Sequence, residues 1–376
     1  EVLTMSQRGT FNAITVYPGR ELDSNYSMNT VDLCPVGALT SKDFRFKMRV
    51  WFLKETKTID VDCGTGTNIT LWTREDKVYR ITPRQNDAVN SCWMPDSHRL
   101  NYKYINAETR IPQPVIRTDA EAPHRPSTWE PALASAAEAV KRIAPNQLAI
   151  IASGRMTNEE LYMVRHLAAQ IGTDMVDIVP RMGESDGMLI SADRNPNTNG
   201  ARLVLGIEPG SRLDAIREGV RSGSVKGILT LGEDLTSPEA GFTAEELDKL
   251  DYLFMTAHSA NETARHADLV LPGVTYAEKF GTMINVTGRI QRLNRAIQPI
   301  GYARDDWQIF RDITLLLGGN PALKNFNSAL DILTAMSTEY GALNGVSWGS
   351  IGDGGQPILE TGVTIPVVER EKNQGR

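Results

Sequence analysis

A cysteine followed directly by proline stands near the start of the chain, in the run Cys34-Pro35-Val36-Gly37-Ala38-Leu39. Cys-Pro is the usual form of the last ligand in a bacterial-type iron–sulfur motif. A [4Fe–4S] cluster of this type takes four thiolates, and its short-spaced C-x2-C-x2-C partners should precede the proline. No cysteine precedes Cys34, and the chain begins with Glu1. We therefore expect Cys34 to be a metal ligand of a [4Fe–4S] cluster whose other ligands lie upstream of Glu1 in a longer polypeptide. The alternative is a small buried thiol before a turn.

A second pattern has the outline of a lost metal site: Asp60-Val61-Asp62-Cys63-Gly64-Thr65-Gly66-Thr67, followed by Trp93-Met94-Pro95. The [4Fe–4S] module of molybdopterin-dependent oxidoreductases reads C-x2-C-G-x-G-C, with a fourth cysteine downstream. Its four ligand positions fall on Asp60, Cys63, Thr67 and Pro95. Carboxylate and hydroxyl groups are poor ligands for a sulfide cluster and proline offers none, so we expect no cluster here.

The remaining thiols and imidazoles give weaker signals. Cys63 is interpreted as a leftover small residue in a glycine-rich turn, and Cys92, beside Trp93, as a packing thiol. A cluster shared by Cys34, Cys63 and Cys92 stays open as an alternative that their spacing does not favour. Ser185 lies in an Asp-Gly turn, where serine usually serves the turn itself. None of the histidines pairs with another histidine or a cysteine at metal spacing; they are His98, His124, His166, His258 and His266.

The elements that would position these residues divide the chain into five segments. Residues 1–43 predict a loop-rich remnant of a ferredoxin-like iron–sulfur domain, and residues 44–105 a β-rich degenerate [4Fe–4S] module, with alternating strands at 45–53, 68–73 and 77–81. A proline-bearing linker over 106–130 leads to an α/β domain over 131–330. Residues 331–376 form a C-terminal tail of unassigned role.

The α/β domain is predicted from alternating apolar runs and amphipathic segments. Thr157 and Glu160 form a capping box for a helix that Gly172 ends. Ligands of doubly wound domains bind outside the carboxyl ends of the strands. No dinucleotide or P-loop motif follows these strands, so neither site is supported. The expected strands are 147–153, 175–179, 201–207, 225–231, 252–256 and 268–271, with further helices at 212–221 and 244–250.

Composition excludes several classes of protein. Charged residues at 23% and apolar residues at 41% are ordinary for a globular chain, and no apolar run is long enough to span a membrane. A net charge of −6 argues against nucleic-acid binding. Three sparse cysteines indicate a reducing compartment, which we infer to be the cytoplasm or an equivalent matrix.

Taken together, the motifs resemble the large iron–sulfur subunit of bacterial NADH:quinone oxidoreductase, respiratory complex I, and cover roughly residues 1–318. Several motifs occur in the order found in the family: the Cys34 run, then Cys63-Gly64-Thr65-Gly66-Thr67-Asn68-Ile69, then Ala267-Asp268-Leu269-Val270-Leu271-Pro272 with Glu278-Lys279-Phe280-Gly281. The resemblance implies a small β-rich module followed by a doubly wound molybdopterin-oxidoreductase-like domain that serves as a scaffold without a molybdenum cofactor. It implies partners among the other peripheral-arm subunits and a peripheral place on the cytoplasmic face of the inner membrane.

The main hypothesis is an electron-transfer subunit that carries electrons from NADH toward quinone through iron–sulfur clusters. The chain alone is not expected to be catalytic, although it would belong to an enzyme. Two alternatives stay open: a catalytic molybdopterin oxidoreductase related to formate dehydrogenase, and a cofactor-free scaffold.

Overall fold

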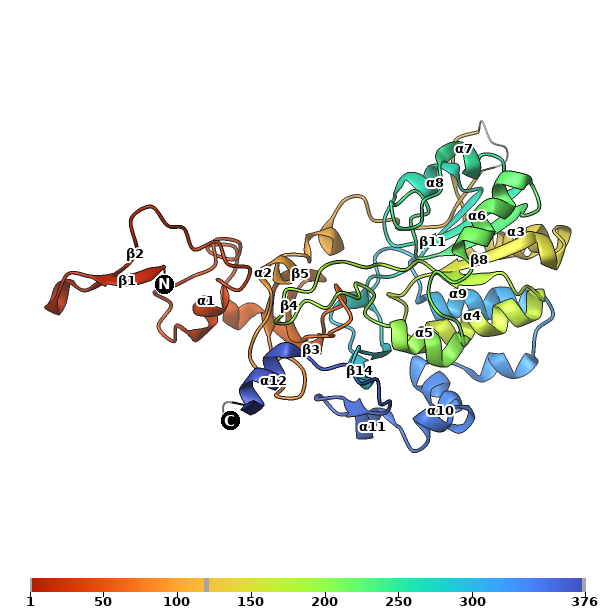
Figure 1. Cartoon of the computed structure of the whole chain (residues 1–376). Helices are drawn as coiled ribbons and strands as arrows, with labels where there is room; N and C mark the ends of the chain where they lie inside the picture. The colour runs from red at the N-terminus through yellow and green to blue at the C-terminus, as the bar shows by residue number, and fades with distance from the viewer. Residues whose placement is uncertain (1, 118–121, 374–376) are drawn as a thin grey trace.

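The N-terminal segment projects away from the body of the molecule. The computed structural model describes residues 2–117 and 122–373. In it β1 (Leu3–Ser6) pairs antiparallel with β2 (Ala13–Val16), and this hairpin lies at the far end from the α/β part (Figure 1). The short helix α1 (Asn29–Leu33) follows and ends one residue before Cys34. The hairpin is solvent-exposed along both strands.

The β-rich module lies between this segment and the α/β body (Figure 1). Its three antiparallel strands are β3 (Lys54–Ile59), β4 (Asn68–Arg74) and β5 (Lys77–Pro83), and the short helix α2 (Asp96–Arg99) follows them. Ile59, Ile69 and Leu71 belong to its buried core. Two of the expected strands are thus confirmed.

The expected strand at 45–53 is wrong. Residues 43–47 form turns, and residues 50–52 form a short 3-10 helix. Phe46 has a left-handed φ of +64°, which breaks an extended run, and its ring is exposed beneath the Arg45 guanidinium. Alternation predicts a strand only where one face is buried, and here the apolar side chains of the pattern point outward.

A seven-stranded sheet forms the centre of the α/β body. Its five central strands are parallel in the order β12-β11-β10-β8-β9, and two short antiparallel strands, β6 and β7, extend one edge. Because the parallel strands are buried on both faces, they read in the sequence as continuous apolar runs. The strands are β8 (Leu148–Ala152), β9 (Val176–Ile178), β10 (Gly227–Leu231), β11 (Tyr252–Ala257), β12 (Leu269–Pro272), β6 (Val115–Ile116) and β7 (Arg125–Pro126).

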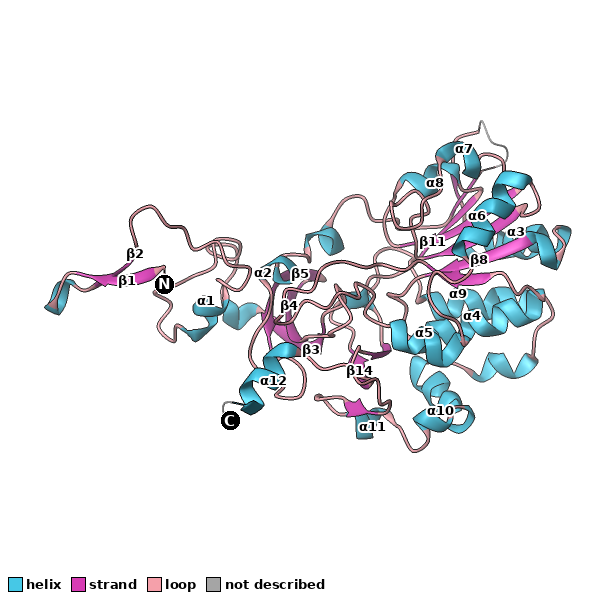
Figure 2. Ribbon diagram, viewed as in Figure 1, coloured by secondary structure: helices cyan, strands magenta, loops and turns pink. Residues whose placement is uncertain are grey.

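Helices cover both faces of this sheet, which confirms the predicted doubly wound class (Figure 2). Ile150 and Leu229 pack into one core and their neighbours Ile151 and Ile228 into the other, as the period-two alternation of strands requires. The first face carries α3 (Trp129–Arg142), α4 (Asn158–Ile171) and α9 (Asp306–Leu316); the second carries α6 (Leu213–Ser222), α7 (Ala244–Leu247) and α8 (Glu262–His266).

The capping box of α4 is confirmed, and one expected strand is not. Thr157 and Glu160 cap each other's backbone N–H groups, and Gly172 ends the helix in the left-handed region. The run expected as a strand at 201–207 belongs instead to helix α5 (Thr198–Leu205). A short apolar run does not distinguish the two states, and Ala201 and Val204, one helical turn apart, are buried against the α4 side of the core.

The C-terminal residues return to the other parts of the chain. Strand β15 (Gln356–Pro357) pairs with β14 (Arg289–Leu293), which also pairs with β13 (Gly281–Ile284). The last described helix, α12, packs Val367 and Val368 beside Val89 and Leu189 near the β-rich module. The further helices are α10 (Ala329–Glu339), α11 (Trp348–Ile351) and α12 (Pro366–Asn373). The domain limits drawn from the sequence stay a prediction.

Among the described residues, no helix is both long enough and apolar enough to cross a membrane.

Candidate functional site

Cys34 sits directly after α1, where the chain turns back on itself. Its own N–H donates to the carbonyl of Val31, which closes the end of the helix. The backbone N–H groups of the following residues then face the sulfur: those of Leu39, Val36, Ala38 and Gly37 lower the pKa of the thiol. A thiolate is the form that binds metal, and hydrogen bonds to sulfur are a main control on cluster potentials. The run after Cys34 is therefore a backbone cradle for a thiolate.

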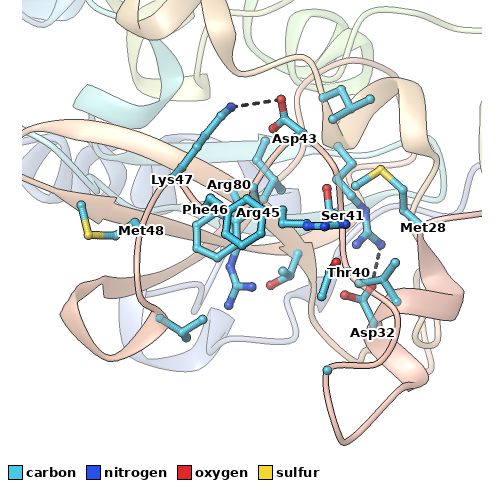
Figure 3. A pocket seen from close by; sticks show the side chains of 18 of the residues that line it. Met28, Asp32, Thr40, Ser41, Asp43, Arg45, Phe46, Lys47, Met48 and Arg80 are labelled. Carbon is cyan, nitrogen blue, oxygen red and sulfur yellow. Dashed lines mark hydrogen bonds and ion pairs between the residues drawn. The ribbon is translucent and has the colours of Figure 1, made fainter.

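Cys34 lines a cavity of about 810 Å³ between residues 28–52 and one side of the β-rich module. Figure 3 shows Asp43 paired with Lys47 at 3.3 Å on one side of this cavity, and a second ion pair at Asp32 on the other. The partner of Asp32 is Arg99 at 2.7 Å. The cavity wall thus combines charged groups with the apolar side chains of the turn.

Arg80 provides a positive charge beside this cavity, and within the described part of the chain no carboxylate forms an ion pair with it. Its guanidinium lies 4.6 Å from the Phe44 ring centre and 4.5 Å from that of Trp72. Burial lowers its pKa, and Asp32 opposes that effect from a distance. Around the cavity the side chains of Leu33, Val36 (81% exposed) and Phe46 (92% exposed) face outward.

The four positions of the lost cluster site hold a different donor set. Asp60 is buried and hydrogen-bonded to His98, and Thr67 is buried. Pro95 precedes α2 as its N-cap residue. Cys63 is 1% exposed, and burial together with the charge of Asp60 raises its pKa to about 11. One thiol of raised pKa among oxygen donors does not fit a [4Fe–4S] cluster, and the expectation of no cluster at this site stays a prediction.

The structure brings together three donors that the sequence did not connect. Side-chain donor atoms of Asp60, Asp62 and His98 lie within 4.8 Å of one another. His98 Nδ1 is 2.6 Å from Asp60 Oδ2, and Asn101 donates to Asp62 Oδ1 at 2.8 Å. Burial and the charge of Asp60 raise the pKa of Asp62 to about 7. The sequence signal was limited to the Asp-x-Asp spacing. His98 lies in α2, two strands further along the chain, so its closeness to the two aspartates could not be seen in the sequence.

The crevice at the carboxyl ends of the parallel strands is small. It is lined by Ser153 after β8, Gly232 after β10 and His258 after β11, and its volume is about 80 Å³. Asn195 fills the space beside Gly154, whose Cβ position would lie 2.4 Å from the Asn195 side chain. Sites for ligands of cofactor size typically enclose several hundred Å³. The residues at this crevice therefore do not fit a molybdopterin cofactor.

Buried ion pairs surround the crevice. Lys279 Nζ lies 2.8 Å from both carboxylate oxygens of Glu160, and Arg110 Nη2 lies 2.6 Å from Glu278 Oε2. Burial lowers the pKa of His258 to about 4, with Arg110 and Lys279 adding to the effect. These groups fix the strand ends against the segment that leads out of the β-rich module.

The other candidates have local roles. Ser185 accepts from the N–H of Gly187 and is part of the turn, as expected. Cys92 is exposed, so its assignment as a packing thiol is wrong; the apolar neighbour Trp93 suggested burial, but the bend places the thiol outside. Asn261 caps α8 between His258 and His266. His166 packs against the edge of Tyr162.

Comparison with known proteins gives three family matches in order along the chain. Residues 1–40 match the ferredoxin-like domain of NADH-quinone oxidoreductase subunit 3, residues 53–103 match the 4Fe-4S domain of NADH-ubiquinone oxidoreductase NDSU1/NuoG-like proteins, and residues 187–314 match molybdopterin oxidoreductase. The chain is thus similar to NuoG and 78 kDa subunits of NADH oxidoreductases, and it contains a segment similar to molybdopterin oxidoreductase.

Individual relatives agree with this assignment. The chain is 27% identical to the NADH-ubiquinone oxidoreductase 78 kDa subunit of Neurospora crassa, over 83% of this chain and 58% of that one. It is 26% identical to the corresponding NADH-quinone oxidoreductase subunit of Rickettsia felis, over 81% of this chain and 62% of that one. The chain thus spans about six tenths of the length of these relatives.

A solved structure supports the fold. Acetylene hydratase from Pelobacter acetylenicus superimposes with a TM-score of 0.57 at 10% identity, over 78% of this chain and 73% of that one. At this level of identity the likeness shows the fold alone.

Proposed function

We propose that this NuoG-like chain is an electron-transfer and scaffold subunit of an NADH:quinone oxidoreductase, and that Cys34 is one ligand of a [4Fe–4S] cluster. The observation that carries the proposal is the Cys34-Pro35 run, which lies inside residues 1–40, the segment that matches a ferredoxin-like domain. The backbone N–H groups from Val36 to Leu39 support it, because they lower the pKa of the Cys34 thiol. A buried structural cysteine would show the opposite shift, as Cys63 does.

The cluster, when bound, supplies one-electron transfer, and the residues of this chain act on it through position and charge. The backbone N–H groups of residues 36–39 lower the pKa of the thiol and so favour the thiolate form that binds metal. Arg80 and Arg99 place positive charge on the wall of the same cavity. Among the described residues Cys34 belongs to no group of three or more possible ligands, so the proposal takes the remaining thiolates from outside this sequence.

We further propose that the α/β domain is a scaffold and holds no molybdenum cofactor. Support comes from the crevice of about 80 Å³ and from the oxygen-rich donor set around Cys63, which offers no path for electrons from a metal in that crevice. The alternative, a catalytic molybdopterin oxidoreductase, would need a crevice that fits the cofactor and a path that carries electrons away from it.

The partners and location follow from the same proposal. The relatives named above are subunits of NADH oxidoreductases, and we propose the other peripheral-arm subunits as partners, at the cytoplasmic face of the inner membrane. The exposed apolar residues around the Cys34 cavity, Val36 and Phe46 among them, would be covered in that assembly.

The test replaces single cysteines in the full-length subunit within its assembled complex. Cys34→Ala should remove the EPR signal of one cluster and reduce electron transfer from NADH to quinone. Cys92→Ala, which removes an exposed thiol, is the matched control and should change neither. An unchanged cluster count in Cys34→Ala would refute the assignment.

A further inference from the structure

The second iron–sulfur-like segment contains a side-chain cluster that the electron-transfer proposal does not use. It consists of Asp60 and Asp62, just after β3, and His98 in α2. All three lie within residues 53–103, the part of the chain that matches a 4Fe-4S domain. This segment has kept a single cysteine, Cys63, at the positions that would bind a cluster there, and that thiol is buried and turned toward the carbonyl of Leu189.

The three donors converge from two separate segments. One donor atom from each of Asp60, Asp62 and His98 lies within 4.8 Å of the other two, so a single ion between them could reach all three. Asp60 is 3% exposed and His98 is 8% exposed, whereas Asp62 is partly open to solvent. The site therefore has a buried floor and an entry side.

The donor set selects the ion by its chemistry. Two carboxylate oxygens and one imidazole nitrogen suit first-row divalent transition ions, and above all Zn²⁺, which is bound by three protein ligands and water in open sites. Ca²⁺ and Mg²⁺ prefer all-oxygen sites. Asn101 donates to Asp62 at 2.8 Å and fixes the direction of that carboxylate, a contact that metal sites commonly use to hold a ligand.

We propose that Asp60, Asp62 and His98 bind one divalent transition-metal ion of the zinc class, at the place where related modules hold an iron–sulfur cluster. The ion neutralises two neighbouring carboxylates and takes the place of the direct contact between Asp60 and His98. It connects the loop after β3 to α2, the two segments that a cluster would connect in related modules. Its role is structural, because an ion of the zinc class does not change its oxidation state and so carries no electrons.

The competing arrangement is a metal-free ion pair between Asp60 and His98. That arrangement uses Asp60 and His98 only and leaves the second carboxylate, Asp62, held by Asn101. The two arrangements therefore differ in what they require of Asp62: a metal needs its oxygen, and the ion pair does not. Asp62→Asn is the deciding substitution, and it is conservative because Asp62 is partly exposed.

The test loads the metal-stripped chain with Zn²⁺ or Co²⁺ by equilibrium dialysis, followed by elemental analysis and, for Co²⁺, visible absorption. The wild type should bind one ion per chain, with the absorption of a nitrogen- and oxygen-ligated Co²⁺ site. Asp62→Asn and His98→Gln should each weaken binding at least tenfold. Cys63→Ser should bind like the wild type, as should the controls Asp87→Asn, in the same module, and His166→Gln, in the α/β domain.

Three outcomes would overturn the proposal: no ion retained by the wild type, equal retention by Asp62→Asn, or a preference for Ca²⁺ over Zn²⁺. A thermal melt of each protein checks folding, and added Zn²⁺ should raise the melting temperature of the wild type but not that of Asp62→Asn. If His98→Gln does not fold, Asp62→Asn alone decides the question.

Discussion

Replacing Arg110 with methionine should destabilise the protein more than any surface ion-pair substitution. Arg110 donates to Glu278 at 2.6 Å, to the Ile105 carbonyl at 2.8 Å and to the His258 carbonyl at 2.9 Å. The side chains of Arg110 and Glu278 are 2% and 1% exposed. The substitution keeps most of the side-chain volume but removes the positive charge and every one of these donors.

The magnitude follows from burial. Removing one partner of a buried pair leaves an uncompensated charge and costs about 3–5 kcal/mol. Glu278 would still accept from Thr275 and Ile300, so we expect the lower half of this range, about 3–4 kcal/mol. At about 2 °C per kcal/mol for a large domain, the melting temperature should fall by about 6–8 °C.

The assay is thermal and urea unfolding of Arg110→Met beside a matched control. Arg165→Met breaks the pair between Arg165 and Glu339, whose side chains are 46% and 38% exposed, and should cost about 0–1 kcal/mol. The double variant Arg110→Met/Glu278→Gln should recover part of the loss, because it removes the unpaired charge. Equal losses in Arg110→Met and Arg165→Met would refute the reasoning.

Three further predictions concern protonation, thiols and metal content. The pKa of His258 is about 4 in the folded protein and about 6.5 in the unfolded chain. The folded protein is therefore most stable, with respect to this group, above pH 6.5. It loses stability as the pH falls toward 4, because the unfolded chain binds the proton first. We expect a loss of about 3 kcal/mol over that window, absent in His258→Gln; an NMR titration showing a charged His258 at pH 6 would contradict this. Native labelling followed by mass spectrometry should modify Cys92 and Cys34 but not Cys63, whose pKa is about 11; rapid labelling of Cys63 would contradict its burial. Metal analysis of the intact complex should find no stoichiometric molybdenum or tungsten, and extractable pterin would favour the catalytic alternative.

Local signals in the sequence predicted much of the fold because they have local physical causes. The capping box at Thr157 and the left-handed Gly172 fix the ends of α4 within a few residues of chain. Apolar runs such as 148–152 identify strands that are buried on both faces. The runs at 45–53 and 201–207 were assigned wrongly because their secondary structure depends on what packs against them, and the local pattern of residues does not contain that information.

The candidate sites also differ in whether they are built from residues that are close together or far apart in the sequence. Cys34 could be proposed as a ligand from its own proline and the residues that follow, because the backbone groups that lower its pKa are consecutive in the chain, and its role as a ligand stays a prediction. The contact between Asp60 and His98 could not, because it joins residues 38 positions apart through the packing of α2 on the β-rich module. The small crevice could not be predicted either, because its lining comes from residues far apart in the sequence, such as Val61, Ser153 and Asp306.

The central claim is that the Cys34 sulfur is a cluster ligand, and a cryo-EM map of the full-length subunit in its complex tests it most directly. We expect continuous density from the Cys34 Sγ to an iron–sulfur cluster, with the N–H groups of residues 36–39 directed at that sulfur. A map in which every cluster is bound by other cysteines and the Cys34 thiol is free would contradict it.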